Sequence, residues 1–312
     1  MTDQLSQTWA DPNPPTTTDP RARTVLTIAG VVLTLVVVAT LVVVVITKRD
    51  NIFRAKHDNE VVLTAANTAG PDPFTAPMIT GRPAVSEQAA QAIQTATGQL
   101  PVSADRGARL VSGARPGLYG TPAQGNVCDA AALANYLVIR RANASAWASA
   151  LKLQIDQVPA YLNTLTPVVL TIDTWVTANR YSNRQAAPYQ AVLQAGSAVL
   201  VDPAGVPRVH CMSGDPLLPP AAVDFGKLKV KGQAWPGYEP QYVAAISYTD
   251  APASFTDPVA MTPMTEFRLA NLDTGDELTR SAGGTIAMPA GSSAALPDPI
   301  TMNAPPEKFA GR

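Results

Sequence analysis

The residues from Thr24 to Thr47 form an unbroken stretch without a charged side chain, rich in Val, Leu and Ile. As a helix rising ~1.5 Å per residue, this stretch spans the ~30 Å hydrocarbon core of a bilayer. Its β-branched residues would favour a strand in water, but a lone strand in lipid leaves its backbone groups unpaired. The stretch runs directly into Lys48-Arg49-Asp50 without a small-residue cleavage site, so we expect an uncleaved anchor rather than a signal peptide.

The sequence carries conflicting signals about the orientation of this anchor in the membrane. More Lys and Arg residues follow the stretch than precede it, which by itself favours a cytoplasmic C-terminal part. Against this stand the short tail 1–23, typical of a cytoplasmic stub, and the cysteines Cys128 and Cys211, whose even number suits an oxidising compartment. We expect a single-pass plasma-membrane protein whose C-terminal domain is extracytoplasmic.

The charge composition excludes one class of partner. Charged residues make up 15% of the chain and the formal net charge is −1, so the sequence carries no basic footprint for nucleic acid. Its two histidines, His57 and His210, do not have zinc-motif spacing with the cysteines, and we expect no metal and no cofactor.

Composition shifts divide the chain into segments. The fold class expected is α+β: one transmembrane helix, then a small extracytoplasmic domain of short helices followed by an antiparallel sheet, with disordered ends. The segments are a disordered cytoplasmic tail (1–23), the transmembrane helix (24–47), a stalk with a possible short helix capped by Ser86 (48–115), a compact α+β domain (116–220), a β-rich extension packed on it (221–280) and a disordered tail (281–312).

Within the compact domain, helix signals come before strand signals. Helices are predicted after a cap at Asn126 or Asp129 through Arg140, over 145–151, and over 156–165 with Pro159 in the first turn. Strands are predicted over 168–177, over 191–201 with a bulge at Gly196, and over 206–211, the last two joined as a hairpin by the turn 202–205. Further strand-like runs cover 242–248 and 266–272.

Cys128 and Cys211 are the sharpest pair of candidate residues. We expect a disulfide that ties the first helix to the end of the hairpin; the alternative is two separate buried thiols. His210 beside Cys211 does not make a nucleophilic dyad, because adjacent side chains of a strand point to opposite faces. Serine chemistry lacks a base, and no Gly-x-Ser-x-Gly motif occurs.

The remaining candidates are carboxylates and aromatics. Asp173 and Asp215 are the pair nominated for acid/base work, although a solvated strand position for Asp173 and a turn before Pro216 for Asp215 are the favoured explanations. Alternation over 168–177 places Asp173 and Trp175 on one polar face, where an exposed aromatic marks a binding surface. Trp235 and Tyr238 join them as candidate binding residues.

The sequence also carries a recognisable set of motifs. They are Gly117-Leu118-Tyr119-Gly120, Cys128-Asp129, Trp147-Ala148, 165–168, 173–177, 192–202 and 205–211, with flanking pieces at 70–75 and 235–238. Over roughly residues 60 to 285 this set resembles an actinobacterial (mycobacterial-type) envelope domain of unknown function. The resemblance implies an anchored or secreted protein and carries no activity. Relatives often have Cys-x-Cys-Gly-Asn-Pro-Leu after the hairpin, where this chain has Ser213 for the second cysteine, which argues against a redox or metal function there.

Two functions remain open from the sequence. The first is a non-enzymatic, membrane-anchored envelope protein whose exterior domain binds or scaffolds another envelope component, protein or cell wall. The alternative is a carboxylate-dependent cell-wall hydrolase, which requires a cleft where Asp173 meets a second carboxylate.

Overall fold

The computed structural model of the chain describes residues 59–81, 84–100, 104–105, 107–247, 263–287 and 296. The stretch 24–47 expected to span the membrane, the tail before it and most of 281–312 lie outside these residues. Within the described part of the chain, no helix is long and apolar enough to cross a bilayer.

The helices are short and begin where the sequence offers caps. The Ser86 hydroxyl accepts a hydrogen bond from Ala89 N at 3.0 Å, which confirms the predicted cap. Of the two caps offered for the next helix, Asn126 and Asp129, it is the Asp129 carboxylate that accepts a hydrogen bond from Ala132 N, at 2.8 Å. The helices are α2 (Glu87–Gly98), α3 (Ala130–Ile139), α4 (Arg141–Ala150) and α5 (Val158–Thr164), with the 3-10 turns η1 (Ile155–Gln157), η2 (Phe225–Lys227) and η3 (Pro240–Tyr242).

Strands provide most of the regular structure. They are β1 (Glu60–Thr64), β2 (Ala104–Asp105), β3 (Ala108–Ser112), β4 (Tyr119–Thr121), β5 (Thr166–Leu170), β6 (Thr174–Ser182), β7 (Gln185–Leu193), β8 (Ala198–Val201), β9 (Pro207–His210), β10 (Asp215–Leu218), β11 (Lys229–Lys231), β12 (Ala244–Ser247), β13 (Glu266–Asn271) and β14 (Glu277–Ser281).

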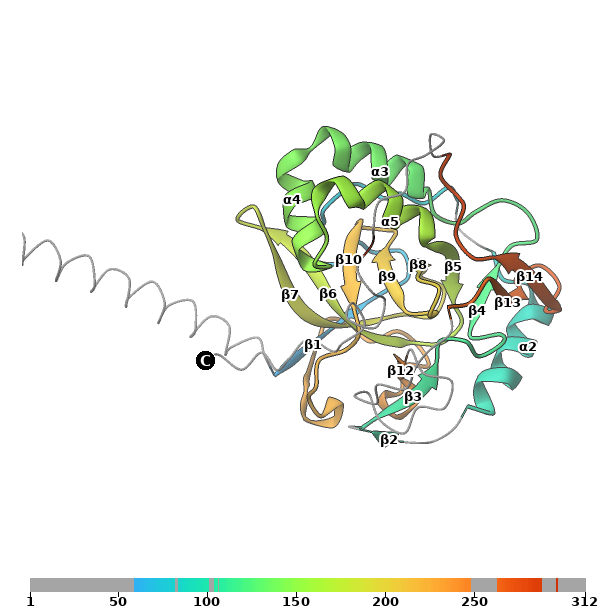
Figure 1. Cartoon of the computed structure of the whole chain (residues 1–312). Coiled ribbons are helices and arrows are strands. Elements are labelled where there is room, and N and C mark those ends of the chain that lie inside the picture. The colour runs from blue at the N-terminus through green and yellow to red at the C-terminus, as the bar shows by residue number, and fades with distance from the viewer. Residues whose placement is uncertain are drawn as a thin grey trace, which may run out of the picture. The chain divides into compact units, whose positions relative to one another are not determined.

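Among the described residues these strands form one 14-stranded mixed sheet (Figure 1). Its main path runs β11-β1-β7-β6-β10-β9-β8-β5-β4-β13-β14; β12 pairs with β6 beside β10, and β3 and β2 follow β12. Pairing is parallel where β1 meets β7 and β11, where β12 meets β3 and β6, and where β13 meets β4.

This architecture corrects the expected fold class. The expectation of short helices followed by an antiparallel sheet is wrong: the described chain is mostly a large mixed sheet with few helices. The expected transmembrane helix over 24–47 falls on residues outside the described part of the chain. The segment interpreted as a stalk supplies β1 and β3 to this sheet. Parallel partners are far apart in the sequence, and the alternation within one strand carries no information about them.

A long bent hairpin forms the centre of the sheet. The chain from Thr166 to Ser182 pairs antiparallel with the chain from Gln185 to Val201, first as β6 with β7 and then as β5 with β8. Both arms bend at the same level, at 171–173 and at 194–197, where Gly196 N donates to Leu170 O at 2.7 Å. The single strands predicted over 168–177 and 191–201 are therefore each two strands, and Gly196, with φ +93°, lies in a turn rather than a bulge.

Three hydrophobic clusters cover the faces of this hairpin. Alternate residues of β5 and β8, such as Val169 and Leu200, face α3, α4 and α5, while Val168 and Val199 face inward toward Val176 and Ala191 of the other half. The outer face of β6 and β7 packs on the segment 223–238. Both faces of β5, of β8 and of the halves of β6 and β7 next to the bend are buried, as in a layered sandwich, whereas residues 180–189 are partly or fully exposed.

Cys128 and Cys211 form a disulfide, as the sequence predicted, with their Cα atoms 5.8 Å apart. Cys128 precedes α3 and Cys211 follows β9, so the bond joins the helical layer to the sheet. It closes a sequence separation of 83 residues. In the chain-entropy model such a loop contributes about 4 kcal/mol to stability.

Candidate functional site

Asp173 occupies the bend of the long hairpin and connects three segments. Its Oδ1 accepts a hydrogen bond from Ala195 N on the other arm at 2.8 Å, and its Oδ2 accepts one from the indole Nε1 of Trp235 at 3.0 Å. Ala244 N, at the start of β12, donates to the Asp173 carbonyl at 2.8 Å. The carboxylate thus fixes the segment that follows β11 against the bend.

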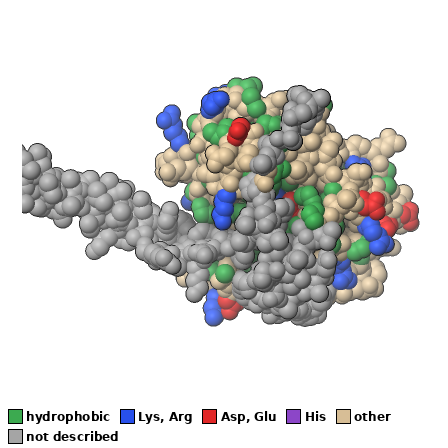
Figure 2. Space-filling model, in the orientation of Figure 1, with side chains coloured by type: hydrophobic (Ala, Val, Ile, Leu, Met, Phe, Trp, Pro, Cys, Tyr) green, Lys and Arg blue, Asp and Glu red, His purple; other side chains and the backbone are tan. Residues whose placement is uncertain are grey.

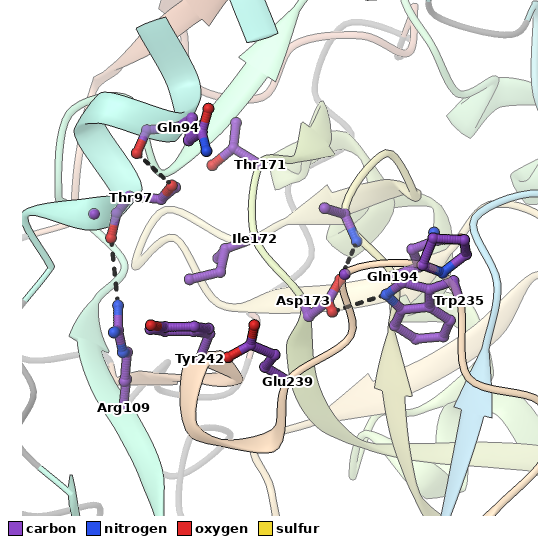
Figure 3. A pocket seen from close by; sticks show the side chains of 14 residues that line it. Gln94, Thr97, Arg109, Thr171, Ile172, Asp173, Gln194, Trp235, Glu239 and Tyr242 are labelled. Carbon is purple, nitrogen blue, oxygen red and sulfur yellow. Dashed lines mark hydrogen bonds between the residues drawn. The ribbon is translucent and has the colours of Figure 1, made fainter. Parts of the chain in front are cut away.

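A cleft of about 640 Å³ opens beside this bend (Figure 3). One wall comes from α2, through Gln94 and Thr97, and the floor from residues 171–173 and 194–195 of the hairpin. The opposite wall is the segment 235–242, and Arg109 of β3 lies at one end. The cleft has the size of small-molecule sites, about 300–1,000 Å³.

Burial alters the acid–base property of Asp173. It raises the pKa of this carboxyl above the ordinary value, and the hydrogen bonds from Ala195 and Trp235 offset part of the rise because they stabilise the ionised form. Glu239 is a second carboxylate on the cleft wall. The two acids lie on the floor and on the wall formed by segment 235–242.

Arg109 brings the opposite charge. Its Nε donates to Gln241 O at 3.2 Å and its Nη1 lies 3.4 Å from Thr97 O. The guanidinium lies over the ring of Tyr242, with Cζ 4.5 Å from the ring centroid, in cation–π geometry. The cleft therefore combines aromatic faces, amides, hydroxyls and charges of both signs.

The structure brings together only part of the predicted binding set. Asp173 and Trp235 line the cleft, and Tyr238 packs edge-on against Trp235 with ring centroids 5.2 Å apart. Trp175, which the alternation placed on an exposed face, is completely buried and packs against Phe225 at 5.0 Å. The alternation failed because the segment 223–238 covers the second face of β6, and because the bend separates Asp173 from the strand.

The nominated partner of Asp173, Asp215, does not line the cleft. It lies on β10, fully buried, where Oδ1 accepts a hydrogen bond from Phe74 N at 3.1 Å. Glu239 replaces it as the second acid of the cleft. Sequence reasoning missed Glu239, Arg109 and Tyr242, because each stands in a short segment without a motif, brought to the cleft by long-range pairing such as β3 with β12.

His210 and Ser213 come close to each other in the core beside Asp215. The Ser213 hydroxyl lies 3.2 Å from His210 Nδ1, and burial lowers the pKa of His210 to about 4. His210 is 2% exposed, and Ser213 and Asp215 are 0% exposed, so a substrate has no access to them. This cluster is not a hydrolytic site in the described structure.

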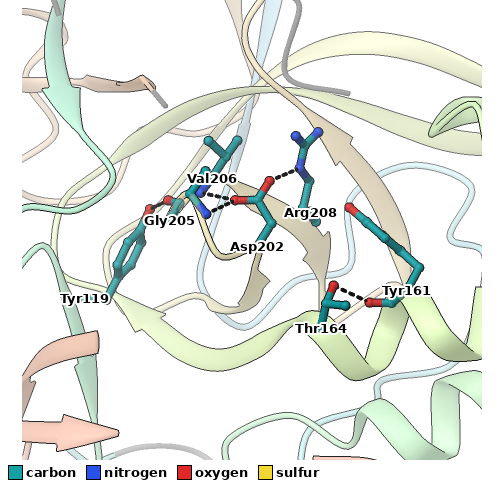
Figure 4. A network of polar contacts seen from close by, with 8 residues as sticks. Tyr119, Tyr161, Thr164, Asp202, Gly205, Val206 and Arg208 are labelled. Atoms are coloured by element: carbon teal, nitrogen blue, oxygen red, sulfur yellow. Dashed lines mark hydrogen bonds and ion pairs between the residues drawn. The ribbon is translucent and has the colours of Figure 1, made fainter. Parts of the chain in front are cut away.

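Asp202 does more than form the predicted turn (Figure 4). Its Oδ1 accepts from Ala204 N and Val206 N at 2.9 Å, and its Oδ2 accepts from Arg208 Nε at 2.8 Å in a buried ion pair. The Tyr119 hydroxyl donates to the Gly205 carbonyl beside it. This network stabilises the β8–β9 hairpin and does not line the cleft.

Charged side chains of both signs are visible on one face of the molecule (Figure 2). On the face in Figure 2, Lys and Arg side chains are scattered among acidic and uncharged ones. Within the described ranges, no three His, Cys, Asp or Glu side chains lie close enough together to hold a metal ion.

Comparison with known proteins places the chain in a family. A family model described as Domain of unknown function (DUF6777) matches residues 109–283, from Arg109 of the cleft through the end of the sheet. Comparison with curated proteins and with solved structures gave no match. Because the matched residues make up more than half of the chain, it belongs to the DUF6777 family.

Proposed function

We propose that this chain is a non-enzymatic protein of the cell envelope that binds another envelope component in the cleft at the bend of the long hairpin. The observation that carries the proposal is the cleft itself, of about 640 Å³, where Trp235 and Tyr242 lie among Gln94, Gln194 and Arg109. Aromatic faces supply contact area and the polar groups supply orientation, as in specific ligand sites.

Two features support a location at the membrane with the folded part outside the cytoplasm. The Cys128–Cys211 disulfide suits an oxidising compartment. The uncharged stretch 24–47 of the sequence supports attachment to the plasma membrane. We propose this location on these grounds together.

Binding is favoured over hydrolysis by the state of Asp173. Both carboxylate oxygens already accept hydrogen bonds from the N–H groups of Ala195 and Trp235. The Asp173 side chain therefore holds the cleft wall in place. The presence of Glu239 in the same cleft favours a second candidate, a hydrolase that uses the two carboxylates, and the raised pKa of Asp173 fits a general acid.

One experiment separates the two. The full chain in detergent is tested for capture of cell-wall material and for release of soluble fragments, together with Trp235→Ala, Asp173→Asn and Glu239→Gln. Binding predicts that Trp235→Ala reduces capture at least tenfold, and that no variant changes fragment release from background. Fragment release by the wild type that Glu239→Gln abolishes, with capture retained, would replace the binding proposal by the hydrolase.

A further inference from the structure

Arg109 is a buried arginine that forms no ion pair with any residue in the described part of the chain. The residue is 7% exposed and lies on the cleft wall. The ion pairs among described residues are Arg208 with Asp202, Lys227 with Asp224, Lys231 with Glu60 and Arg268 with Glu277. Asp173 and Glu239 line the same cleft, yet neither forms an ion pair with Arg109.

The guanidinium of Arg109 is nevertheless held in one orientation. The Gln241 carbonyl accepts from Nε, the Thr97 carbonyl accepts from Nη1, and the Tyr242 ring covers one face. A guanidinium has five N–H groups, and these contacts use two. The donors that remain are on Nη1 and Nη2, where described residues supply no further acceptor, and they match the two oxygens of a carboxylate.

A buried cation without a counter-ion is unfavourable, and an anionic ligand would remove that cost while making charge-assisted hydrogen bonds. We propose that Arg109 receives a carboxylate of the ligand. This inference rests on the proposed binding function and specifies its ligand. Asp173 and Trp235 lie away from Arg109 across the cleft (Figure 3). Since Asp173 and Glu239 both repel an anion, the ligand's carboxylate lies at Arg109 and the rest of the ligand lies toward Trp235.

Two sources present such a carboxylate in an envelope, a sugar acid and the C-terminus of a short peptide. The test measures binding of matched probes to the full chain in detergent by calorimetry. One pair is N-acetylmuramic acid and N-acetylglucosamine, which lacks the carboxylate; the other is trialanine and trialanine amide. We expect the acid of one pair to bind at least tenfold more tightly than its partner without the carboxylate, and that pair identifies the source.

Variants tie this preference to the residue. Arg109→Gln should abolish the preference and Arg109→Lys should retain part of it. Arg141→Gln, at an exposed arginine of α4, should change nothing. The comparison of each acid with its partner lacking the carboxylate is made in the wild type and needs no variant. The proposal can therefore be overturned even if Arg109→Gln does not fold.

Failure of this inference is distinguishable from failure of the proposed function. If neither pair shows a carboxylate preference, or inorganic phosphate displaces the probe at lower concentration than acetate, the carboxylate assignment is overturned. If Trp235→Ala still abolishes capture of wall material in that case, binding in the cleft stands. Unchanged capture by Trp235→Ala would overturn both.

Discussion

The indole of Trp235 and the carboxylate of Asp173 are joined by a hydrogen bond of 3.0 Å across 62 residues of sequence. The bond links the wall of the cleft to the bend of the hairpin that forms its floor. Because Ala195 N donates to the other oxygen of Asp173, one side chain fixes three parts of the site. The cleft is therefore built at the bend of the central hairpin, with α2 and the segment 235–242 as its walls.

The disulfide should stabilise the fold substantially. Replacing Cys128 and Cys211 together by Ser should lower the free energy of unfolding by about 4 kcal/mol, because the unfolded chain loses its closed loop. At ~2–4 °C per kcal/mol, the melting temperature should fall by several degrees or more. Mass mapping of the non-reduced wild type should find the two peptides joined; free thiols at both positions in protein recovered from the envelope would refute this assignment.

Trp175 should matter for folding rather than for recognition. Trp175→Ala removes a fully buried indole from contact with Phe225 and should destabilise the protein by about 3–5 kcal/mol. Trp235→Ala, at a half-buried indole, is the matched control and should cost much less. Urea denaturation measures both; equal costs would show that the outer face of β6 is less tightly packed than described.

Gly205 should tolerate no side chain. A Cβ at this position would lie 2.1 Å from the Gly113 carbonyl oxygen, and the backbone has φ +74°. Gly117 has a similar φ of +73°, but a Cβ there would have no atom within 4 Å. Gly117→Ala therefore measures the cost of the backbone conformation alone. Gly205→Ala should therefore destabilise the protein by about 2 kcal/mol more than Gly117→Ala. Equal losses in thermal denaturation would contradict the close approach of the two glycine segments.

His210 should make the fold sensitive to acid. Burial lowers its pKa from 6.5 to about 4, so between these values the unfolded chain binds more protons than the folded one. The contribution of His210 to the free energy of unfolding has its full value above pH 6.5. It falls by on the order of 3 kcal/mol as the pH decreases to 4.

His210→Gln should lack this component. Asp215, opposite His210 on β10, has a pKa raised by burial and contributes the opposite slope, because the folded state then holds the extra proton. The informative quantity is therefore the difference in unfolding free energy between wild type and variant, measured by urea denaturation across this pH range. A difference that does not vary with pH would refute the buried neutral histidine.

Local signals in the sequence predicted local structure correctly. Ser86 and Asp129 cap helices because their side chains satisfy backbone N–H groups a few residues away, and the turn 202–205 joins β8 to β9 as expected. The disulfide between the two cysteines was also expected, with two separate buried thiols as the alternative, and the structure contains it.

Contacts between segments far apart in the sequence could not be predicted in the same way. The bend at 171–173 interrupts an alternation that reads as one strand, and the pairing of β1 with β7 depends on residues more than a hundred positions apart. Asp173 and Trp235 were identified as candidates, but Arg109, Glu239 and Tyr242 were not. They reach the cleft only through the pairing of β3 with β12 and the turn η3 before it.

The most direct test of the account is where the partner touches the chain in intact cells. A photo-crosslinking residue is placed at Gln194, on the cleft floor, and in a separate protein at Ser145, which is exposed on α4 and does not line the cleft. The account predicts that irradiation yields a covalent adduct with an envelope component from position 194, lost when Trp235→Ala is added, and none from position 145. An adduct from position 145 with none from position 194, or an adduct from 194 that persists with Trp235→Ala, would contradict binding in the cleft.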